Sequence, residues 1–99
     1  MIHVLAIITA VPGKRGALLQ AFKRIVPTVK AEAGCIEYAP VIDVEGADPA
    51  YGPDTFVVVE KWESMAALKA HGAAPHMAAY SAETKDLLAS AAVHVLAAA

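Results

Sequence analysis

Four side chains that can bind or move protons gather in one short stretch of the sequence. Glu60 and Trp62 close a run of Thr, Phe and Val that is typical of a β-strand. Because alternate residues of a strand point to the same face, we expect the carboxylate and the indole side by side. His71 and His76 follow on either side of a Gly-Ala-Ala-Pro helix break. An imidazole is the usual proton acceptor near neutral pH, so this stretch predicts acid–base chemistry.

Each of these groups also has a purely structural interpretation. Glu60 could pair with a neighbouring lysine, and Trp62 could simply fill the core. His71 could cap a helix C-terminus, where a cation is favoured, and His76 could lie on the surface. The other two histidines, His3 and His94, lie in predicted strands, and local hydrogen bonds explain them better.

Aromatic side chains could hold a flat ligand beside these groups. Phe56 shares the strand face of the carboxylate and the indole, and the hydroxyls of Tyr38, Tyr51 and Tyr80 could orient a ring. No metal site is predicted, because HExxH and CxxC motifs are absent and Cys35 is the only cysteine. No GxGxxG or P-loop sequence is present to bind a nucleotide or flavin, so we expect no cofactor.

Composition indicates one small domain over residues 1–99, expected to be cytoplasmic. The net charge is -2 and basic residues do not cluster, which argues against nucleic-acid binding. A single cysteine suits a reducing compartment. The apolar start of the chain lacks a basic leading segment and ends early at Pro12-Gly13. It is too short to span a bilayer, so no membrane association is expected.

The elements that must position the candidate site follow a βαββαβ order. Hydrophobic patterns predict strands over 2–11, 35–44, 55–62 and 91–97, a helix over 14–33, and a second helical region split into 64–71 and 75–88. Pro27 is expected to kink or split the first helix near residues 23–26. Pro40 favours an edge position or a bulge for the second strand. This order predicts a ferredoxin-like α+β sandwich, with an antiparallel sheet covered by helices on one face.

The first strand predicts a partner for the other face of the sheet. Both of its faces are almost wholly apolar, and 58% of the chain is hydrophobic, which is high for a small domain. Two sheets packed face to face would bury this surface. We therefore expect a homodimer.

Most of the chain resembles the antibiotic biosynthesis monooxygenase domain family, and within it the small bacterial quinol monooxygenases. The resemblance is carried by IVPTVKAEAGCIEYAPVID, by EKWESMAALKAHGAAPHMAAYS and by the early Pro-Gly turn. It implies a dimeric α/β barrel and oxidation of a dihydroxy-aromatic by O2 without metal, haem or flavin. The matching positions are Glu60, Trp62, His71 and His76. The sequence contains no asparagine, which argues against the haem-degrading and anthrone-oxidising chemistries of some relatives.

These features are compatible with three functions. The first is a cofactor-independent quinol monooxygenase or oxidase acting on a naphthoquinol-like substrate, with His71 as base, oriented by Glu60 or His76, and with Trp62 and Tyr38 stacked on the ring. The second is an isomerase of a small phosphorylated signal sugar, for which Lys61 and Lys69 are the nearest basic residues. The third is a non-catalytic dimeric binding or stress module whose histidines are structural.

Overall fold

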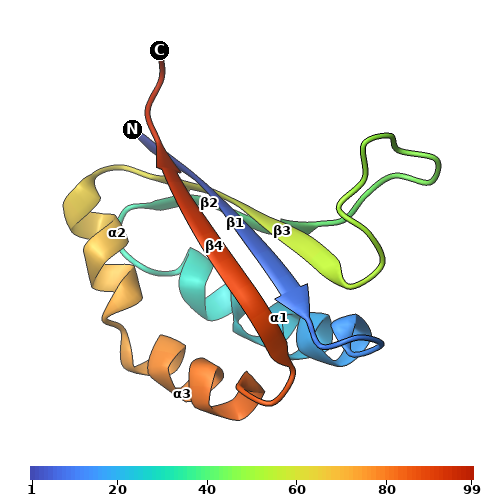
Figure 1. Cartoon of the computed structure of the whole chain (residues 1–99). Helices are drawn as coiled ribbons and strands as arrows, with labels where there is room; N and C mark the ends of the chain where they lie inside the picture. Colours follow the sequence, from blue (N-terminus) through green and yellow to red (C-terminus); the bar gives the residue numbers. More distant parts are fainter.

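The computed structural model describes all residues 1–99 as one four-stranded antiparallel sheet with three helices (Figure 1). In chain order the elements are β1 (Ile2–Ala10), α1 (Arg15–Lys30), β2 (Cys35–Val41), β3 (Thr55–Trp62), α2 (Met65–Gly72), α3 (Pro75–Thr84) and β4 (Leu88–Leu96). The strands lie in the order β2-β3-β1-β4, and every neighbouring pair is antiparallel. The predicted ferredoxin-like α+β fold is confirmed.

One face of the sheet packs against the helices and forms the core. Strand alternation places Phe56, Val58, Glu60 and Trp62 of β3 on that face, all of them buried. The buried stripe of α1 lies against them, and it contains Leu18, Ala21, Phe22 and Val29. The core therefore joins the first helix to the strand that carries the candidate carboxylate.

The opposite face of the sheet has no layer over it. Strand pairing puts Leu5 of β1, Val59 of β3 and His94 of β4 side by side on this open face. Leu5 is 36% exposed, and β4 is exposed along its whole length. A single chain leaves this sheet open, so the dimeric α/β barrel that the resemblance implies stays a prediction.

Helix α1 continues without a break through Pro27, contrary to the predicted split. The ring of Pro27 is exposed, so the carbonyl that loses its hydrogen-bond partner can bind water instead. Buried Phe22 and Val29, one on each side of the proline, hold both halves of the helix against the sheet. The helix ends at Lys30, three residues earlier than predicted.

Three other predicted boundaries were wrong. Strand β2 ends at Val41 rather than at residue 44, although its edge position is confirmed. Helix α3 ends at Thr84, whose hydroxyl donates to the carbonyl of Tyr80 at 2.8 Å. Strand β4 then begins at Leu88, three residues before the predicted start, because pairing with Ala10 of β1 extends it. Such pairing is a tertiary contact that the local pattern does not contain.

The connection between β2 and β3 projects away from the rest of the molecule (Figure 1). The carboxylate of Asp43 accepts hydrogen bonds from the backbone N–H groups of Tyr51, at 3.1 Å, and Gly52, at 2.9 Å. None of the helices combines the length and the apolar character that a bilayer crossing requires.

Candidate active site

Glu60 and Trp62 form a buried pair at the end of β3. They are 6% and 0% exposed, and the indole Nε1–H donates to Oε1 of Glu60 at 2.9 Å. The alternation of the strand places both side chains on one face, as predicted, and the structure shows that the helices cover this face. The bond gives the buried carboxylate a donor that it would otherwise lack.

His71 lies directly beside this pair. The Ser64 hydroxyl caps α2 by accepting from the N–H of Ala67 at 3.2 Å, which fixes where the helix starts and places His71 in its last turn. The imidazole is 7% exposed, and its centroid lies 4.7 Å from the indole of Trp62 and 5.4 Å from the ring of Tyr38. The imidazole therefore belongs to the aromatic core rather than to the surface.

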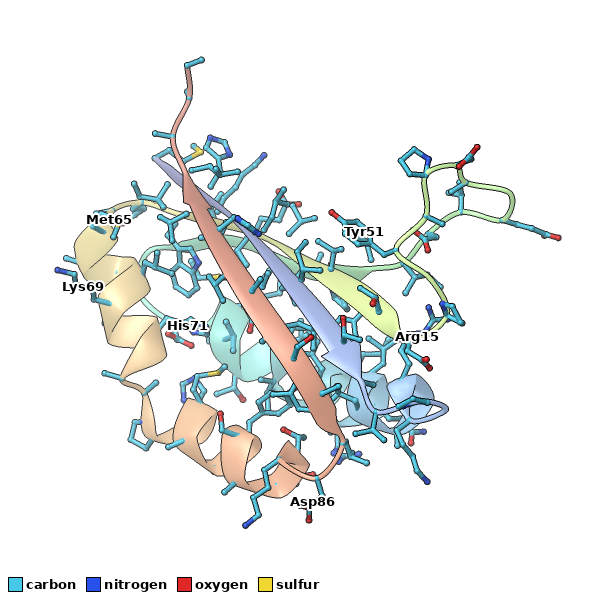
Figure 2. The ribbon with its side chains drawn as sticks, in the orientation of Figure 1. Arg15, Tyr51, Met65, Lys69, His71 and Asp86 are labelled. Atoms are coloured by element: carbon cyan, nitrogen blue, oxygen red, sulfur yellow. The ribbon has the colours of Figure 1, made fainter.

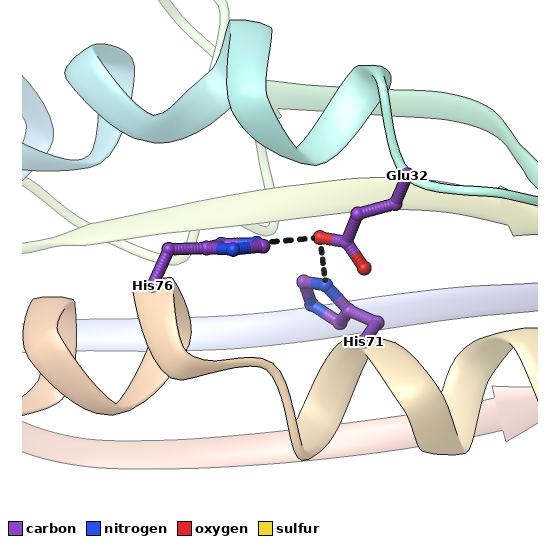
Figure 3. A group of neighbouring side chains, drawn as sticks. All are labelled: Glu32, His71 and His76. Carbon is purple, nitrogen blue, oxygen red and sulfur yellow. Dashed lines mark hydrogen bonds and ion pairs between the residues drawn. The ribbon is translucent and has the colours of Figure 1, made fainter.

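Glu32 joins the two histidines, and the sequence analysis did not identify it. Its Oε2 atom lies 3.0 Å from Nδ1 of His71 and 2.8 Å from Nε2 of His76 (Figure 3). Glu32 follows α1, whereas the histidines come from the end of α2 and the start of α3. The helix break turns both imidazoles toward the same carboxylate. The ring of His71 is thus held by Glu32, and Glu60 instead holds Trp62.

The hydrogen-bond pattern assigns the protons. A carboxylate only accepts hydrogen bonds, so Nδ1 of His71 and Nε2 of His76 carry the hydrogens that point at Glu32. In the neutral form of His71, its Nε2 atom then keeps a free lone pair. This nitrogen is the one available to take a proton from a substrate.

The aromatic residues proposed as ligand contacts are brought together by the fold. Tyr38 is 3% exposed and Phe56 is fully buried, and both rings pack on Phe22, at centroid distances of 5.3 and 5.4 Å. Tyr80 of α3 meets Phe22 edge to face at 6.0 Å. Tyr51, by contrast, is 60% exposed and lies far from His71 in Figure 2.

Burial controls the protonation of two groups beside His71. Desolvation raises the pKa of Glu60, while the Trp62 hydrogen bond and the nearby His71 act in the opposite direction. Desolvation, with a further contribution from the Glu60 carboxylate, raises the pKa of Tyr38 far above its ordinary value. The phenol of Tyr38 therefore stays protonated and can act as a hydrogen-bond donor.

Glu32, His71 and His76 are also the residues that could hold a metal ion, since one donor atom from each lies within 4.8 Å of the others. The two distances to the carboxylate, 2.8 and 3.0 Å, are those of hydrogen bonds. Donors around a tetrahedral zinc with bonds of about 2.0–2.1 Å stand roughly 3.3 Å apart. The arrangement therefore fits proton sharing better than coordination, because a metal would have to move the carboxylate oxygen away from both imidazoles.

Two hollows lie on the open face of the sheet rather than beside the imidazoles. One has a volume of about 460 Å³ and is lined by residues that include His3, Val59 and Leu96. The other lies near the β2–β3 connection, between Leu5 and Tyr51. Neither touches His71, so the apolar pocket expected next to that residue stays a prediction.

Comparisons with known proteins identify the family. Residues 1–83 match the model of a family described as antibiotic biosynthesis monooxygenase. A protein named "Probable quinol monooxygenase YgiN" from Escherichia coli (strain K12) is 45% identical over 89 residues, which cover 86% of each chain.

Solved structures share the fold of this chain. PA3566 from Pseudomonas aeruginosa is 29% identical, with a TM-score of 0.82 over 96% of this chain and 90% of the other. Rv0793 from Mycobacterium tuberculosis has the same identity and TM-score over 99% of this chain and 94% of the other. The buried Glu-Trp-His cluster thus lies within a fold and a sequence pattern that place the chain in the antibiotic biosynthesis monooxygenase family.

Proposed function

We propose that this chain oxidises a dihydroxy-aromatic of the quinol type with O2, needs no metal, haem or flavin, and uses His71 as the base. Family membership makes it a monooxygenase-type oxidoreductase, and the name of the YgiN relative supports a quinol substrate. The observation that carries the proposal is the imidazole of His71. Its Nδ1 atom is held by Glu32, and its ring lies against Trp62 and Tyr38.

The base is needed because a quinol reduces O2 poorly until it loses a proton. Nε2 of His71 accepts the hydroxyl proton, and the quinolate then passes electrons to O2. For a naphthoquinol, one O2 gives a hydroxynaphthoquinone and one water, so the substrate supplies both electrons that reduce the second oxygen atom. The residues supply a base, orientation and protection from water.

The aromatic neighbours would position the substrate. Trp62 offers an indole face that its bond to Glu60 fixes in place, and Tyr38 offers a neutral hydroxyl that can donate to a ring oxygen. Phe56 and Tyr80 line the same core through their contacts with Phe22. Entry of a ring requires these side chains to separate, because Trp62 and Phe56 are fully buried. A ligand pocket would therefore open on binding.

We also propose a homodimer in which two open sheet faces pack together. The support is the apolar character of that face at Leu5, Val57 and Val59, together with the exposed edge strand β4. A second copy of the chain presents the same apolar surface, so the contact is self-complementary. Packing would cover both hollows of the open face.

The alternative functions have less support. An isomerase of phosphorylated sugars needs cations beside the site, but Lys61 pairs with Glu37 at 3.3 Å on the open face and Lys69 is exposed on α2. The cluster beside His71 instead contains two carboxylates, Glu32 and Glu60, which repel phosphate. A non-catalytic module would consume O2 with a reduced naphthoquinone no faster than buffer does.

Oxygen uptake with a chemically reduced naphthoquinone tests the proposal. We expect O2 consumption above the buffer rate, and a loss of about 100-fold or more in His71→Gln. Glu83→Gln is the control, because Glu83 pairs with the exposed Arg24 away from both His71 and the open sheet face, and it should keep wild-type activity. Wild-type uptake equal to buffer across naphthoquinols and benzoquinols would refute the function, and full activity in His71→Gln would refute the assigned base.

A further inference from the structure

A single carboxylate oxygen serves two imidazoles of different exposure. The side chains of His71, Glu32 and His76 are 9%, 14% and 29% exposed, in that order along the chain of contacts (Figure 3). The buried end touches the proposed substrate contacts, Trp62 and Tyr38. The other end reaches solvent. The three side chains thus form a path from the core to water.

The charges of this cluster restrict how many protons it can hold. Glu32 supplies one negative charge, which balances one imidazolium. The ring nitrogens of His71 and His76 lie within 4.8 Å of each other, so two imidazolium ions would repel strongly at this burial. The other groups facing His71 are the Glu60 carboxylate, already bonded to Trp62, and the neutral phenol of Tyr38.

We propose that Glu32 couples the two histidines, so that His76 releases a proton to solvent when His71 takes one from the substrate. This role of Glu32 as a positioning residue rests on the proposed quinol oxidation. At the start, His71 is neutral and His76 is an imidazolium paired with Glu32. The quinol O–H bond breaks, and its proton bonds to Nε2 of His71. The N–H bond at Nδ1 of His76 then breaks, and that proton passes to water.

All hydrogen bonds of the cluster survive this exchange. Nδ1–H of His71 and Nε2–H of His76 donate to Glu32 before and after it, since the protons that move are on the other nitrogens. The total charge of the three side chains also stays constant. The transfer therefore needs no rearrangement and leaves the net charge of the cluster unchanged, which explains why the base is linked to a second, more exposed histidine.

Titration of the histidine ring signals by NMR tests the coupling without any substrate. In His76→Gln, which keeps a donor for Glu32 but cannot ionise, we expect the titration midpoint of His71 to rise by about 0.5 pH unit or more. His71→Gln should raise the midpoint of His76 in the same way. His94→Gln is the control and should change neither curve. Independent titration of the two histidines, with unchanged midpoints in both variants, would overturn the proposal.

A second measurement separates proton release from structural support. We expect His76→Ala to lower kcat for a reduced naphthoquinone about tenfold and to leave KM within twofold, because the base is still present. Added imidazole should restore most of kcat by carrying the proton from the cluster. Loss of kcat without rescue would overturn the release role. The NMR titration needs no substrate, so it tests the coupling of the two histidines even if the protein oxidises no quinol. Failure of the proposed function and failure of the coupling are therefore distinguishable.

Discussion

Replacement of Trp62 by Phe probes the buried pair on which the site is built. Trp62 is fully buried, and its Nε1–H is the donor to the Glu60 carboxylate, at 2.9 Å. Phenylalanine keeps an aromatic ring but removes that donor. The carboxylate is 6% exposed, so water cannot readily replace the lost bond. The variant therefore leaves a buried charge without its partner.

The expected loss of stability has two parts. A hydrogen bond to a charged group contributes about 1.5–3 kcal/mol, and the smaller ring gives up about 1–2 kcal/mol of packing. We expect Trp62→Phe to lower the free energy of unfolding by about 2.5–5 kcal/mol at pH 7.5. Near pH 4 the loss should shrink toward the packing part, because Glu60 is then protonated.

The direction of this pH dependence follows from the burial of Glu60. Its pKa in the folded state is raised above the ordinary value of 4.5, so wild-type stability falls as pH rises through that pKa. The Trp62 bond lowers the pKa, and without the bond it rises further. The variant therefore loses more stability than the wild type as pH increases from about 4.5.

Urea unfolding at fixed protein concentration, at pH 4 and pH 7.5, provides the measurement. A double-mutant cycle with Glu60→Leu isolates the pair, since the double variant has neither polar group. We expect a coupling energy of about 2 kcal/mol at pH 7.5 that falls below about 1 kcal/mol at pH 4. Equal coupling at both pH values would refute the assignment of the loss to an ionised carboxylate.

Three further predictions concern the turn after α1, the sheet face and metal dependence. A Cβ at Gly34 would meet Cβ of Ala67 at 2.6 Å at φ +82°, whereas one at Gly46, with φ +80°, meets open space. Gly46→Ala should therefore cost about 1 kcal/mol and Gly34→Ala at least twice that in thermal or urea unfolding, and equal losses would contradict the close approach. Leu5→Arg should convert a dimer to a monomer in light scattering, while Val44→Arg in the projecting loop should not; a variant at Leu5 that stays dimeric excludes the open face as the interface. Treatment with EDTA should leave naphthoquinol oxidation within twofold of the untreated rate, and a loss restored by a transition metal would refute metal-free chemistry.

The local features of this protein could be predicted from the sequence alone. The helix from Met65 to Gly72 has a serine cap at its start, a signal that acts within one turn. The alternation that pairs Glu60 with Trp62 is a property of any strand. These short-range rules were sufficient to predict the element order, the ferredoxin-like fold and the gathering of the carboxylate, the indole and the imidazoles.

Features that depend on contacts distant in the chain were decided only by the tertiary structure. Glu32 is separated by 39 residues from His71 and by 44 from His76, and nothing in the Ala-Glu-Ala-Gly segment around it distinguishes it from a solvated glutamate. The continuity of α1 through Pro27 and the early start of β4 likewise arise from packing and strand pairing. Local propensity amounts to a few tenths of a kcal/mol per residue, and burial or pairing of a whole element outweighs it. The chain thus encoded the parts of the site, but the packing of the turn after α1 on the break between α2 and α3 determined which carboxylate holds the base.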